Sequence, residues 1–431
     1  MLDIRALRDE PEAARTALGR RGDPGLLEAL DRALGLDGRR REILSEVELL
    51  KAERNDASRR IGDRKRAGDE ADDLIAEMQV VAERIRALDQ QLAGVERELA
   101  DTLLAIPNLP DERVPVGGEG DFEVRREWGA PAGSPEDGGV PHWEIGESLG
   151  VLDLERGARV AGSGFPLLVG QGARLSRGLI QFMLDLHTSE HGYLEVAPPF
   201  LVNAAALLGT GQLPKFEDDL YRTDRDELYL IPTAEVPVTN LHAGELLSEE
   251  DLPICYVAHT PCFRREAGAA GRDTRGMLRV HQFDKVELVR ITTPERAPDE
   301  LEQLTRHAET VLERLELPYR RILLAAGDLG FSNAITYDLE VWSPGVGRWL
   351  EVSSCSAFTD FQARRADIRY RPSGGGKPVH VHTLNGSGVA LARTIVALLE
   401  TNRQSDGSVS VPDALRPYVG FDRIELPARA G

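Results

Sequence analysis

The sequence lacks the features of several common protein classes. It has 3 cysteines in 431 residues, at positions 255, 262 and 355, and none forms a CxxC pair or lies in a Cys/His cluster. Neither a disulfide framework nor a zinc site is therefore expected. No apolar run reaches the ~18 residues that span a membrane, and the charged N-terminus lacks the apolar core of a signal peptide. The sequence predicts a cytoplasmic protein without a membrane partner.

Positive charge is also scarce. The 52 Lys and Arg residues stand against 72 Asp and Glu residues, which gives a formal net charge of −20. This acidity excludes a protein whose whole surface binds nucleic acid, because phosphates are neutralised by Lys and Arg. It leaves room for a local basic patch. The P-loop pattern GxxxxGK[ST] is absent, so a nucleotide would have to be bound by another kind of site.

The N-terminal region has the apolar spacing of two long helices. Between Leu74 and Leu99, apolar residues recur at alternating steps of 4 and 3, which is an a/d heptad seam, and a weaker seam precedes it from position 43 to 61. In the segment between them, Gly62 and Gly68 can end a helix and Asp72 can cap the next one. The pattern predicts an antiparallel helical hairpin.

This hairpin is long and basic near its tip. Residues 38–66 alone would extend ~43 Å at ~1.5 Å per residue. From Lys51 to Arg66, seven cations stand against three anions. A dimerisation coiled coil is one interpretation of the seams. The other is a phosphate-binding tip, because local positive charge on an acidic protein is where a polyanion would bind.

The rest of the chain predicts a second domain of the α+β class. Six Pro and seven Gly between positions 106 and 141 mark a linker, and we place the domain boundary between residues 110 and 111, giving units 1–110 and 111–431. Alternating segments such as CYVAHT, KVELVRI, TYDLEVWS, WLEVSSCSAF and KPVHVHTL predict strands, whereas helical patterns occur near 171–190, 298–316 and 388–402. Strands without regular βαβ alternation favour an antiparallel sheet.

One pair of predicted strands carries chemistry. Strands around 255–265 and 280–291 would form a hairpin with a glycine-rich loop, and alternate residues of a hairpin share a face. The charged residues expected within reach of each other are Arg264, Glu266, Arg279 and Glu287. Two arginines and two carboxylates together could bind a triphosphate and an amine. A cross-strand ladder of ion pairs is the alternative.

The same segment resembles a known motif. FRREAG followed by RDTRGMLRVHQFDKVE resembles motif 2 of class II aminoacyl-tRNA synthetases, in detail that of the seryl-tRNA synthetase family. Further stretches match this family in order: LHTSEHGYLEVAPPFLVN (motif 1), GTGQLPKF, IPTAEVPVTN, and WLEVSSCSAFTDFQARR with HTLNGSGVALARTIVALLE (the motif 3 region). The hairpin matches the family's helical arm, so the resemblance covers residues 1 to about 420.

The resemblance implies a fold and an activity. The fold would be a class II antiparallel sheet flanked by helices, with an N-terminal antiparallel coiled-coil arm. The activity would be ATP-dependent activation of L-serine to seryl-adenylate with Mg²⁺, followed by transfer to tRNA(Ser) and also to tRNA(Sec). It further implies a homodimer formed through motif 1, with no protein-bound zinc.

The family's site residues transfer by position. Arg264 would hold the α-phosphate and the serine carboxylate, Arg393 the γ-phosphate, Phe283 would stack under adenine and Glu266 would read its amino edge. The implied ATP set is Arg264, Arg265, Glu266, Arg279, Phe283, Glu351, Val352, Ser353, Ser354 and Arg393, with Arg264 and Arg393 catalytic and Glu351 and Ser354 at Mg²⁺. The implied serine set is Thr233, Ala234, Glu235, Arg264, Glu287, Thr383, Asn385 and Ser387. The implied tRNA set is Arg54, Arg59, Arg60, Arg64, Lys65 and Arg66.

Three points qualify this transfer. Which of Glu235 and Glu287 reads the serine hydroxyl and which the ammonium stays open. Arg265 stands where the family usually has Ser, and its alternation with Arg264 would turn its side chain away from ATP. EVSSCS alone would be an ordinary buried strand, and only its place beside motifs 2 and 3 favours a metal position.

Two functions from other classes compete with this interpretation. One is a ligase that loads serine or another small amino acid onto a carrier protein, but such relatives lack the tRNA arm predicted here. The other is a coiled-coil interaction protein with an inactive domain, which conflicts with the complete set of Arg264, Glu266, Glu351 and Arg393.

Overall fold

The computed structural model describes residues 1–131, 133–267 and 275–426. The chain forms two compact units. One comprises residues 1–19 and 23–107, and the other comprises 20–22 and 108–431. Among the described residues, no helix is both long and apolar enough to cross a membrane.

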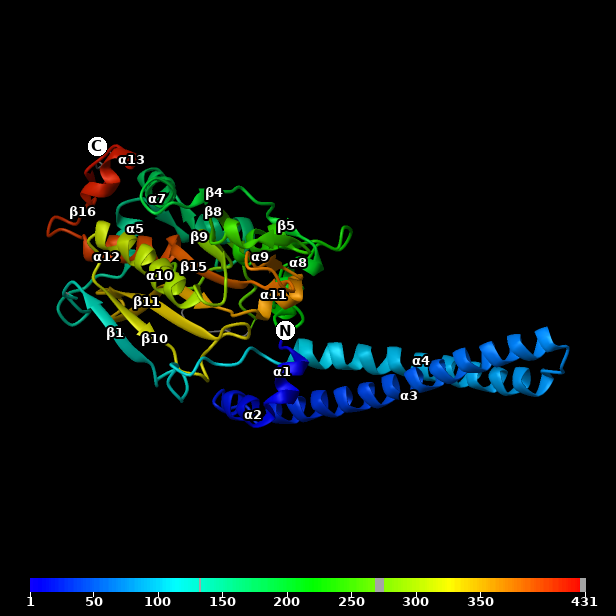
Figure 1. Ribbon diagram of the computed structural model, residues 1–431. Helices are drawn as coiled ribbons and strands as arrows, with labels where there is room; N and C mark the ends of the chain where they lie inside the picture. The colour runs from blue at the N-terminus through cyan, green and yellow to red at the C-terminus, as the bar shows by residue number, and fades with distance from the viewer. Residues whose placement is uncertain (132, 268–274, 427–431) are drawn as a thin grey trace. The chain divides into compact units, whose positions relative to one another are not determined.

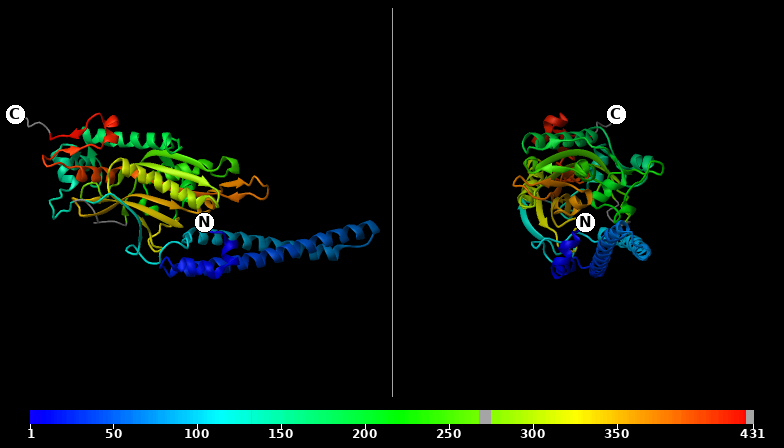
Figure 2. Two further views of the ribbon diagram at one scale, coloured as in Figure 1. Left: turned by 60° about the vertical axis from the view of Figure 1, so that its left-hand side comes forward. Right: turned by 45° about the vertical axis from the view of Figure 1, so that its right-hand side comes forward.

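The first unit is entirely helical. Its helices are α1 (Ile4–Asp9), α2 (Pro11–Gly19), α3 (Gly25–Ala67) and α4 (Asp72–Ala105). Figures 1 and 2 show α3 and α4 lying side by side, joined by a short turn. Ile43 and Val47 of α3 pack against Leu88 and Val95 of α4, which are the positions of the two apolar seams. The predicted helical hairpin is confirmed.

The ends of this hairpin match the prediction at Gly68 and differ from it at Gly62 and Asp72. Gly62 lies inside α3 and does not end it, and Asp72 is the first residue of α4 rather than its cap. The helix ends at Gly68, whose φ of 84° is left-handed and whose N–H bonds back to the carbonyl of Arg64. A glycine can adopt the left-handed conformation that ends a helix, but it can also stay helical. Gly68 adopts it and Gly62 does not, so the helix ends only at Gly68.

The second unit is organised around an eight-stranded sheet. The strands are β1 (Glu123–Trp128), β4 (Leu194–Glu195), β8 (Ile254–Phe263), β9 (Gln282–Thr292), β10 (Tyr319–Leu323), β11 (Ile335–Ser343), β12 (Arg348–Ala357) and β15 (His382–Ala390). Their order in the sheet is β1-β10-β11-β12-β15-β9-β8-β4. All neighbours are antiparallel except β4 and β8. The α+β class with an antiparallel sheet is confirmed.

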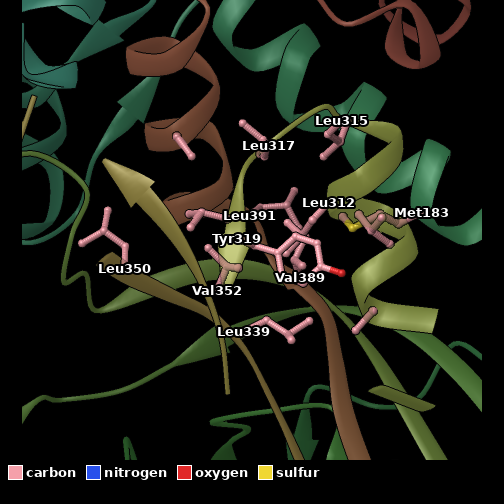
Figure 3. Close-up of a cluster of buried hydrophobic side chains, with 14 of the residues drawn as sticks. Met183, Leu312, Leu315, Leu317, Tyr319, Leu339, Leu350, Val352, Val389 and Leu391 are labelled. Carbon is pink, nitrogen blue, oxygen red and sulfur yellow. The ribbon is translucent and has the colours of Figure 1, made fainter. Parts of the chain in front are cut away.

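Three long helices pack on this sheet and close its core. They are α7 (Gln171–Ser189), α10 (Ala297–Arg314) and α12 (Leu391–Thr401). Figure 3 shows Met183 of α7 and Leu312 of α10 in one buried cluster with Val352, Val389 and Leu391. All five side chains are buried. Because this core is closely packed, it holds the sheet rigidly beneath any site built on the sheet's surface.

Shorter elements complete the unit. The helices are α5 (His142–Ser148), α6 (Leu154–Ala161), α8 (Ala204–Thr210), α9 (Glu235–Thr239), α11 (Phe361–Ala366) and α13 (Arg416–Val419), with 3-10 turns at Glu217–Asp219, Asn240–His242, Glu249–Asp251 and Asp413–Leu415. The strands are β2 (Leu152–Asp153), β3 (Leu167–Leu168), β5 (Leu201–Val202), β6 (Tyr229–Leu230), β7 (Leu246–Ser248), β13 (Arg369–Arg371), β14 (Val379–His380), β16 (Val409–Ser410) and β17 (Arg423–Ile424).

Three segments depart from the sequence prediction. β1 lies inside the expected linker, and its mostly exposed sequence EVRREW has no apolar alternation to reveal it. The predicted strand KPVHVHTL is two strands, β14 and β15, in different sheets. Residues 388–390 belong to β15 rather than to the following helix, because Val389 and Ala390 pair with β9 past an irregularity in register.

Candidate active site

A cavity of about 640 Å³ opens in the second unit. Most of the residues that the sequence assigned to ATP and serine line it. They are Thr233, Glu235, Arg264, Glu266, Arg279, Phe283, Glu351, Val352, Ser354, Asn385, Ser387 and Arg393. These come from β9, β12, β15, the starts of α9 and α12 and the segments that follow β8 and precede β9, so the fold brings together positions up to 160 residues apart in sequence.

Five of the predicted residues do not line the cavity. Arg265 donates its Nη1 to the carbonyl of Asp218 at 3.1 Å, which turns it away as its alternation with Arg264 predicts. Ala234 is buried in a small apolar cluster, and Ser353 bonds the carbonyl of Ser387 at 2.6 Å. The remaining two, Glu287 and Thr383, are fully buried: Glu287 contacts Asn385 of the cavity wall, and Thr383 contacts Gln362 behind it.

Arg264 follows the end of β8, and its guanidinium group lies over an aromatic ring. Its guanidinium carbon lies 5.2 Å from the centroid of Phe283, and its Nε donates to the carbonyl of Pro232 at 3.3 Å. Its two terminal nitrogens donate to no other described residue. Guanidinium groups bind phosphate and carboxylate oxygens through such paired donors, so Arg264 is free to hold an anion.

Glu266 and Arg279 form an ion pair at the cavity wall. Arg279 Nη1 lies 2.5 Å from Glu266 Oε2. Glu266 has a φ of 54°, a left-handed backbone uncommon for residues other than glycine, and such conformations persist where the surroundings hold them. This pair is one part of the alternative cross-strand ladder of ion pairs. The other predicted carboxylate, Glu287, pairs with Lys285 instead. Residues 268–274, in the glycine-rich loop between the two strands, lie outside the described residues.

Arg393 connects the first turn of α12 to two other segments. Its Nη1 donates to the carbonyl of Glu351 at 2.7 Å and its Nε to the carbonyl of Leu278 at 3.1 Å. The Glu351 carboxylate is 3.6 Å from Nη1 and its side chain is about half exposed, at 48%. Arg393 thus adds a positive charge to the cavity while its backbone partners hold it in place.

Carboxylates gather next to Glu351. Asp338 pairs with Ser354 across β11 and β12, and Glu340 pairs with Glu351 itself. Burial and the charge of Glu351 raise the pKa of Asp338 well above its ordinary value, and Oδ1 of Asp338 has no hydrogen-bond partner among the described residues. Oxygen ligands of this kind suit Mg²⁺. No group of three or more His, Cys, Asp or Glu residues in the described part of the chain has the arrangement of a metal site by itself.

Glu235, a further carboxylate of the cavity, takes part in a buried chain of hydrogen bonds. Its Oε1 accepts from Gln362 Nε2 at 2.6 Å, and Gln362 Oε1 accepts from Thr383 Oγ1 at 2.7 Å. Asn385 Nδ2 approaches Glu235 Oε2 at 3.3 Å and Glu287 Oε1 at 2.7 Å. Burial, and then the nearby charge of Glu287, raise the pKa of Glu235 to about 7.

Two residues of this network were not among the predicted set. Lys285 is 5% exposed, and its Nζ lies 2.7 Å from Thr233 Oγ1 and 2.6 Å from Glu287 Oε2. The sequence could have indicated Lys285, since residues 283, 285 and 287 of a strand lie on the same face. No comparable sequence pattern indicates Gln362, because only the tertiary fold brings α11 next to Glu235.

The basic tip belongs to the first unit. Arg54 of α3 is half-buried, whereas Arg59, Arg64 and Arg66 pair with acidic residues. The pairs are Arg59 with Asp56, Arg64 with Asp73 and Arg66 with Asp63. Arg60 and Lys65 are exposed and pair with no described acidic side chain. The tip therefore offers at least two cations to a polyanion.

Comparisons with known families match both units. Residues 1–110 match the family model described as the seryl-tRNA synthetase N-terminal domain, and residues 215–402 match the tRNA synthetase class II core domain (G, H, P, S and T).

Similar proteins and structures agree with these matches. The serine–tRNA ligases of Gemmatimonas aurantiaca and Geobacillus kaustophilus are 55% and 56% identical, each over 97% of this chain and 99% of the relative. The seryl-tRNA synthetase of Pyrococcus horikoshii, solved with ATP, superposes with a TM-score of 0.95 at 38% identity over 99% of this chain and 100% of that one. The cytoplasmic serine–tRNA ligase of Naegleria fowleri, solved with AMP, gives 0.90 at 28% identity over 99% of each chain.

Proposed function

The chain belongs to the seryl-tRNA synthetase family, and we propose that the cavity of its second unit is where serine and ATP react. The chain activates serine and charges tRNA(Ser). In the first step a serine carboxylate oxygen attacks the α-phosphorus of ATP, an O–P bond forms and pyrophosphate leaves. In the second a ribose hydroxyl at the tRNA end attacks the acyl carbon, an ester forms and AMP leaves.

The positive charge of the cavity wall supports the first step. Arg264 holds the α-phosphate and the serine carboxylate together, so that the attacking oxygen and the phosphorus are kept in line. Arg393 holds the γ-phosphate and stabilises the charge that builds on departing pyrophosphate. No protein base is needed, because the serine carboxylate is already ionised at neutral pH.

The adenine would occupy the aromatic part of the cavity. Phe283 offers a ring face, with the guanidinium of Arg264 on it at 5.2 Å, and such a face also stacks on a purine. Glu266 would accept from the adenine amino group, with Arg279 holding the carboxylate in place by their ion pair. The observation that carries the proposal is that arginines, an aromatic ring and a buried carboxylate network line one cavity.

Mg²⁺ fits the acidic part of this cavity. Glu351 and Ser354 line the cavity and would hold it, and Asp338, which pairs with Ser354 and whose Oδ1 lacks a described partner, lies buried beside them. When bound, the ion neutralises phosphate charge.

The serine side chain would be read by the buried network. Glu235 offers acceptors to the serine ammonium, and Thr233, Asn385 and Ser387 supply polar atoms near it. Rejection of alanine follows, because a ligand without a hydroxyl leaves these buried polar groups unpaired. Glu287 would act on serine through Lys285 and Asn385, which its carboxylate contacts.

The helical hairpin would hold the tRNA. Arg60 and Lys65 at its tip can contact backbone phosphates, and the absence of aromatic residues from 51 to 66 suits recognition of RNA shape rather than of bases. tRNA(Sec), where it exists, would be charged in the same way. The hairpin also argues against the carrier-protein ligase, which would have no use for it.

We further propose a homodimer that works in the cytoplasm, where tRNA is used. β4 is only two residues long and stands at one end of the sheet, and Leu194, Phe200 and Leu201 beside it are exposed apolar side chains. A second copy of the chain would cover them, with motif 1 at the interface.

Exchange of labelled pyrophosphate into ATP tests the first step. We expect exchange with serine, and at least about 100-fold lower kcat/KM with alanine or threonine. Charging of tRNA(Ser) tests the second step. Exchange that did not depend on serine, or a chain that charged a carrier protein and no tRNA, would contradict the proposal.

A further inference from the structure

Lys285 is a buried cation with no direct place in the reaction. It lies on β9 between Phe283 and Glu287, and only 5% of its surface is exposed. Its Nζ contacts two acceptors, Thr233 Oγ1 at 2.7 Å and Glu287 Oε2 at 2.6 Å. A buried ammonium is costly unless it is paired, so both contacts are part of how the fold tolerates this residue.

The contact with Thr233 has a fixed direction. An ammonium can only donate hydrogen bonds, so Thr233 Oγ1 must accept from Lys285. The backbone N–H of Glu235 also points at this oxygen, at 3.4 Å. A hydroxyl has two lone pairs and one hydrogen, and both lone pairs are therefore used. The hydrogen of the Thr233 hydroxyl donates to no described residue, and Thr233 lines the cavity.

When ionised, Glu235 acts in the opposite sense, as an acceptor. Both of its carboxylate oxygens accept from amides, Oε1 from Gln362 and Oε2 from Asn385. Glu235 also lines the cavity, so it offers its remaining lone pairs to a ligand. One wall of the cavity thus presents a donor at Thr233 next to an acceptor at Glu235. An amino acid with an ammonium and a nearby oxygen matches this arrangement.

We propose that Lys285 is a positioning residue that holds the Thr233 hydroxyl as a hydrogen-bond donor to an oxygen of the bound serine. The inference rests on the proposed function, because it assigns serine to this cavity. Lys285 also lines the cavity, and we assign its effect to the Thr233 hydroxyl, which its Nζ contacts at 2.7 Å. Without the ammonium, the contact with the Glu235 N–H at 3.4 Å is the one described bond left to the Thr233 oxygen, so the hydroxyl can rotate and present a lone pair to serine.

A simpler role for Lys285 would be neutralisation of Glu287 alone. The two roles differ in how substitutions combine. If Lys285 works through the Thr233 hydroxyl, its removal has little left to change once that hydroxyl is gone. If it only neutralises Glu287, its removal has the same effect whether Thr233 is present or not.

A double-mutant cycle with Lys285→Met and Thr233→Val tests this. The measurements are KM for serine and KM for ATP in pyrophosphate exchange. Each single substitution is expected to raise KM for serine by about tenfold, since a charge-assisted hydrogen bond is lost, and to change KM for ATP by less than about twofold. The double variant is expected to match the worse single variant within about twofold. Thr233→Ser, which keeps the hydroxyl, is expected to keep KM for serine within about threefold of wild type.

Three results would overturn the inference. They are effects that multiply in the double variant, an equal rise of KM for ATP, and a Thr233→Ser variant as weak as Thr233→Val. Should Lys285→Met not fold, as judged by circular dichroism and ATP binding, Lys285→Leu replaces it, with the same pattern expected because this side chain also has no donor for Thr233 Oγ1. A wild-type chain that shows no serine-dependent exchange would instead refute the proposed function itself, which separates the two failures.

Discussion

His142 Nδ1 lies 2.9 Å from a carboxylate oxygen of Glu400, and both side chains are fully buried. On the other side of the ring, the N–H of Met277 donates to His142 Nε2 at 2.9 Å. Since Nε2 accepts, Nδ1 carries the hydrogen and donates to Glu400. Met277 lines the cavity directly after the loop of motif 2. This relay therefore connects α12 to the segment of the cavity wall that we assign to ATP.

Glu400 is the centre of that relay. Besides His142 it accepts from the N–H of Gly345 at 2.9 Å and from the hydroxyl of Ser343. Glu400→Gln keeps the shape but places an amide N–H₂ against several donors. We expect it to lower the free energy of unfolding by roughly 2–4 kcal/mol and to raise KM for ATP more than KM for serine. Urea unfolding and pyrophosphate exchange measure the two effects. A variant with unchanged KM for ATP would show that the relay has only a structural role.

The pH dependence of serine use reports on Glu235. Burial and Glu287 raise its pKa to about 7, so it is protonated below that pH and attracts the serine ammonium only above it. We expect kcat/KM for serine to rise by up to about tenfold per pH unit below pH 7 and to level off above it. Glu235→Gln should flatten this profile and lower its plateau. A wild-type profile without a step near pH 7 would contradict the assignment.

The same shift has a consequence for stability. Because the folded-state pKa of Glu235 is raised from 4.5 to about 7, the folded protein binds more protons than the unfolded one between these values. Its contribution to stability is therefore largest at low pH and is lost as pH rises through this window. Glu235→Gln should reduce the decline in the free energy of unfolding between pH 5 and pH 8, measured by urea unfolding at constant ionic strength.

The sequence predicted features that depend on local spacing. The heptad seams located the hairpin, and the order of motifs located the arginines that line the cavity. It missed features that arise from tertiary contacts: β1, an exposed edge strand without alternation, and Gln362, which reaches Glu235 from α11. Lys285 stood two positions from the named residues Phe283 and Glu287, but its contacts with Thr233 and Glu287 were visible only after folding.

Arg393 is expected to be needed for the chemical step. Arg393→Ala removes the cation that holds the γ-phosphate, and we expect kcat/KM in pyrophosphate exchange to fall at least about 100-fold. Arg423→Ala is the matched control, because Arg423 pairs with Asp406 at the surface and such pairs contribute little. Since Arg393 also bonds the carbonyls of Glu351 and Leu278, thermal unfolding must accompany the assay. Normal exchange in a folded Arg393→Ala variant would refute its role.

Substitutions at the hairpin tip should impair the charging of tRNA and leave the activation of serine unchanged. Arg60→Glu with Lys65→Glu reverses two exposed charges that pair with no described acid, so repulsion of tRNA phosphates should lower kcat/KM for charging by about tenfold or more. The loss should shrink as salt is raised, because screening weakens attraction and repulsion alike. Pyrophosphate exchange, which uses no tRNA, checks that the second unit is intact. Arg97→Glu, an exposed change near the other end of α4, is the control, and an equal loss there would place the contact along the whole hairpin rather than at its tip.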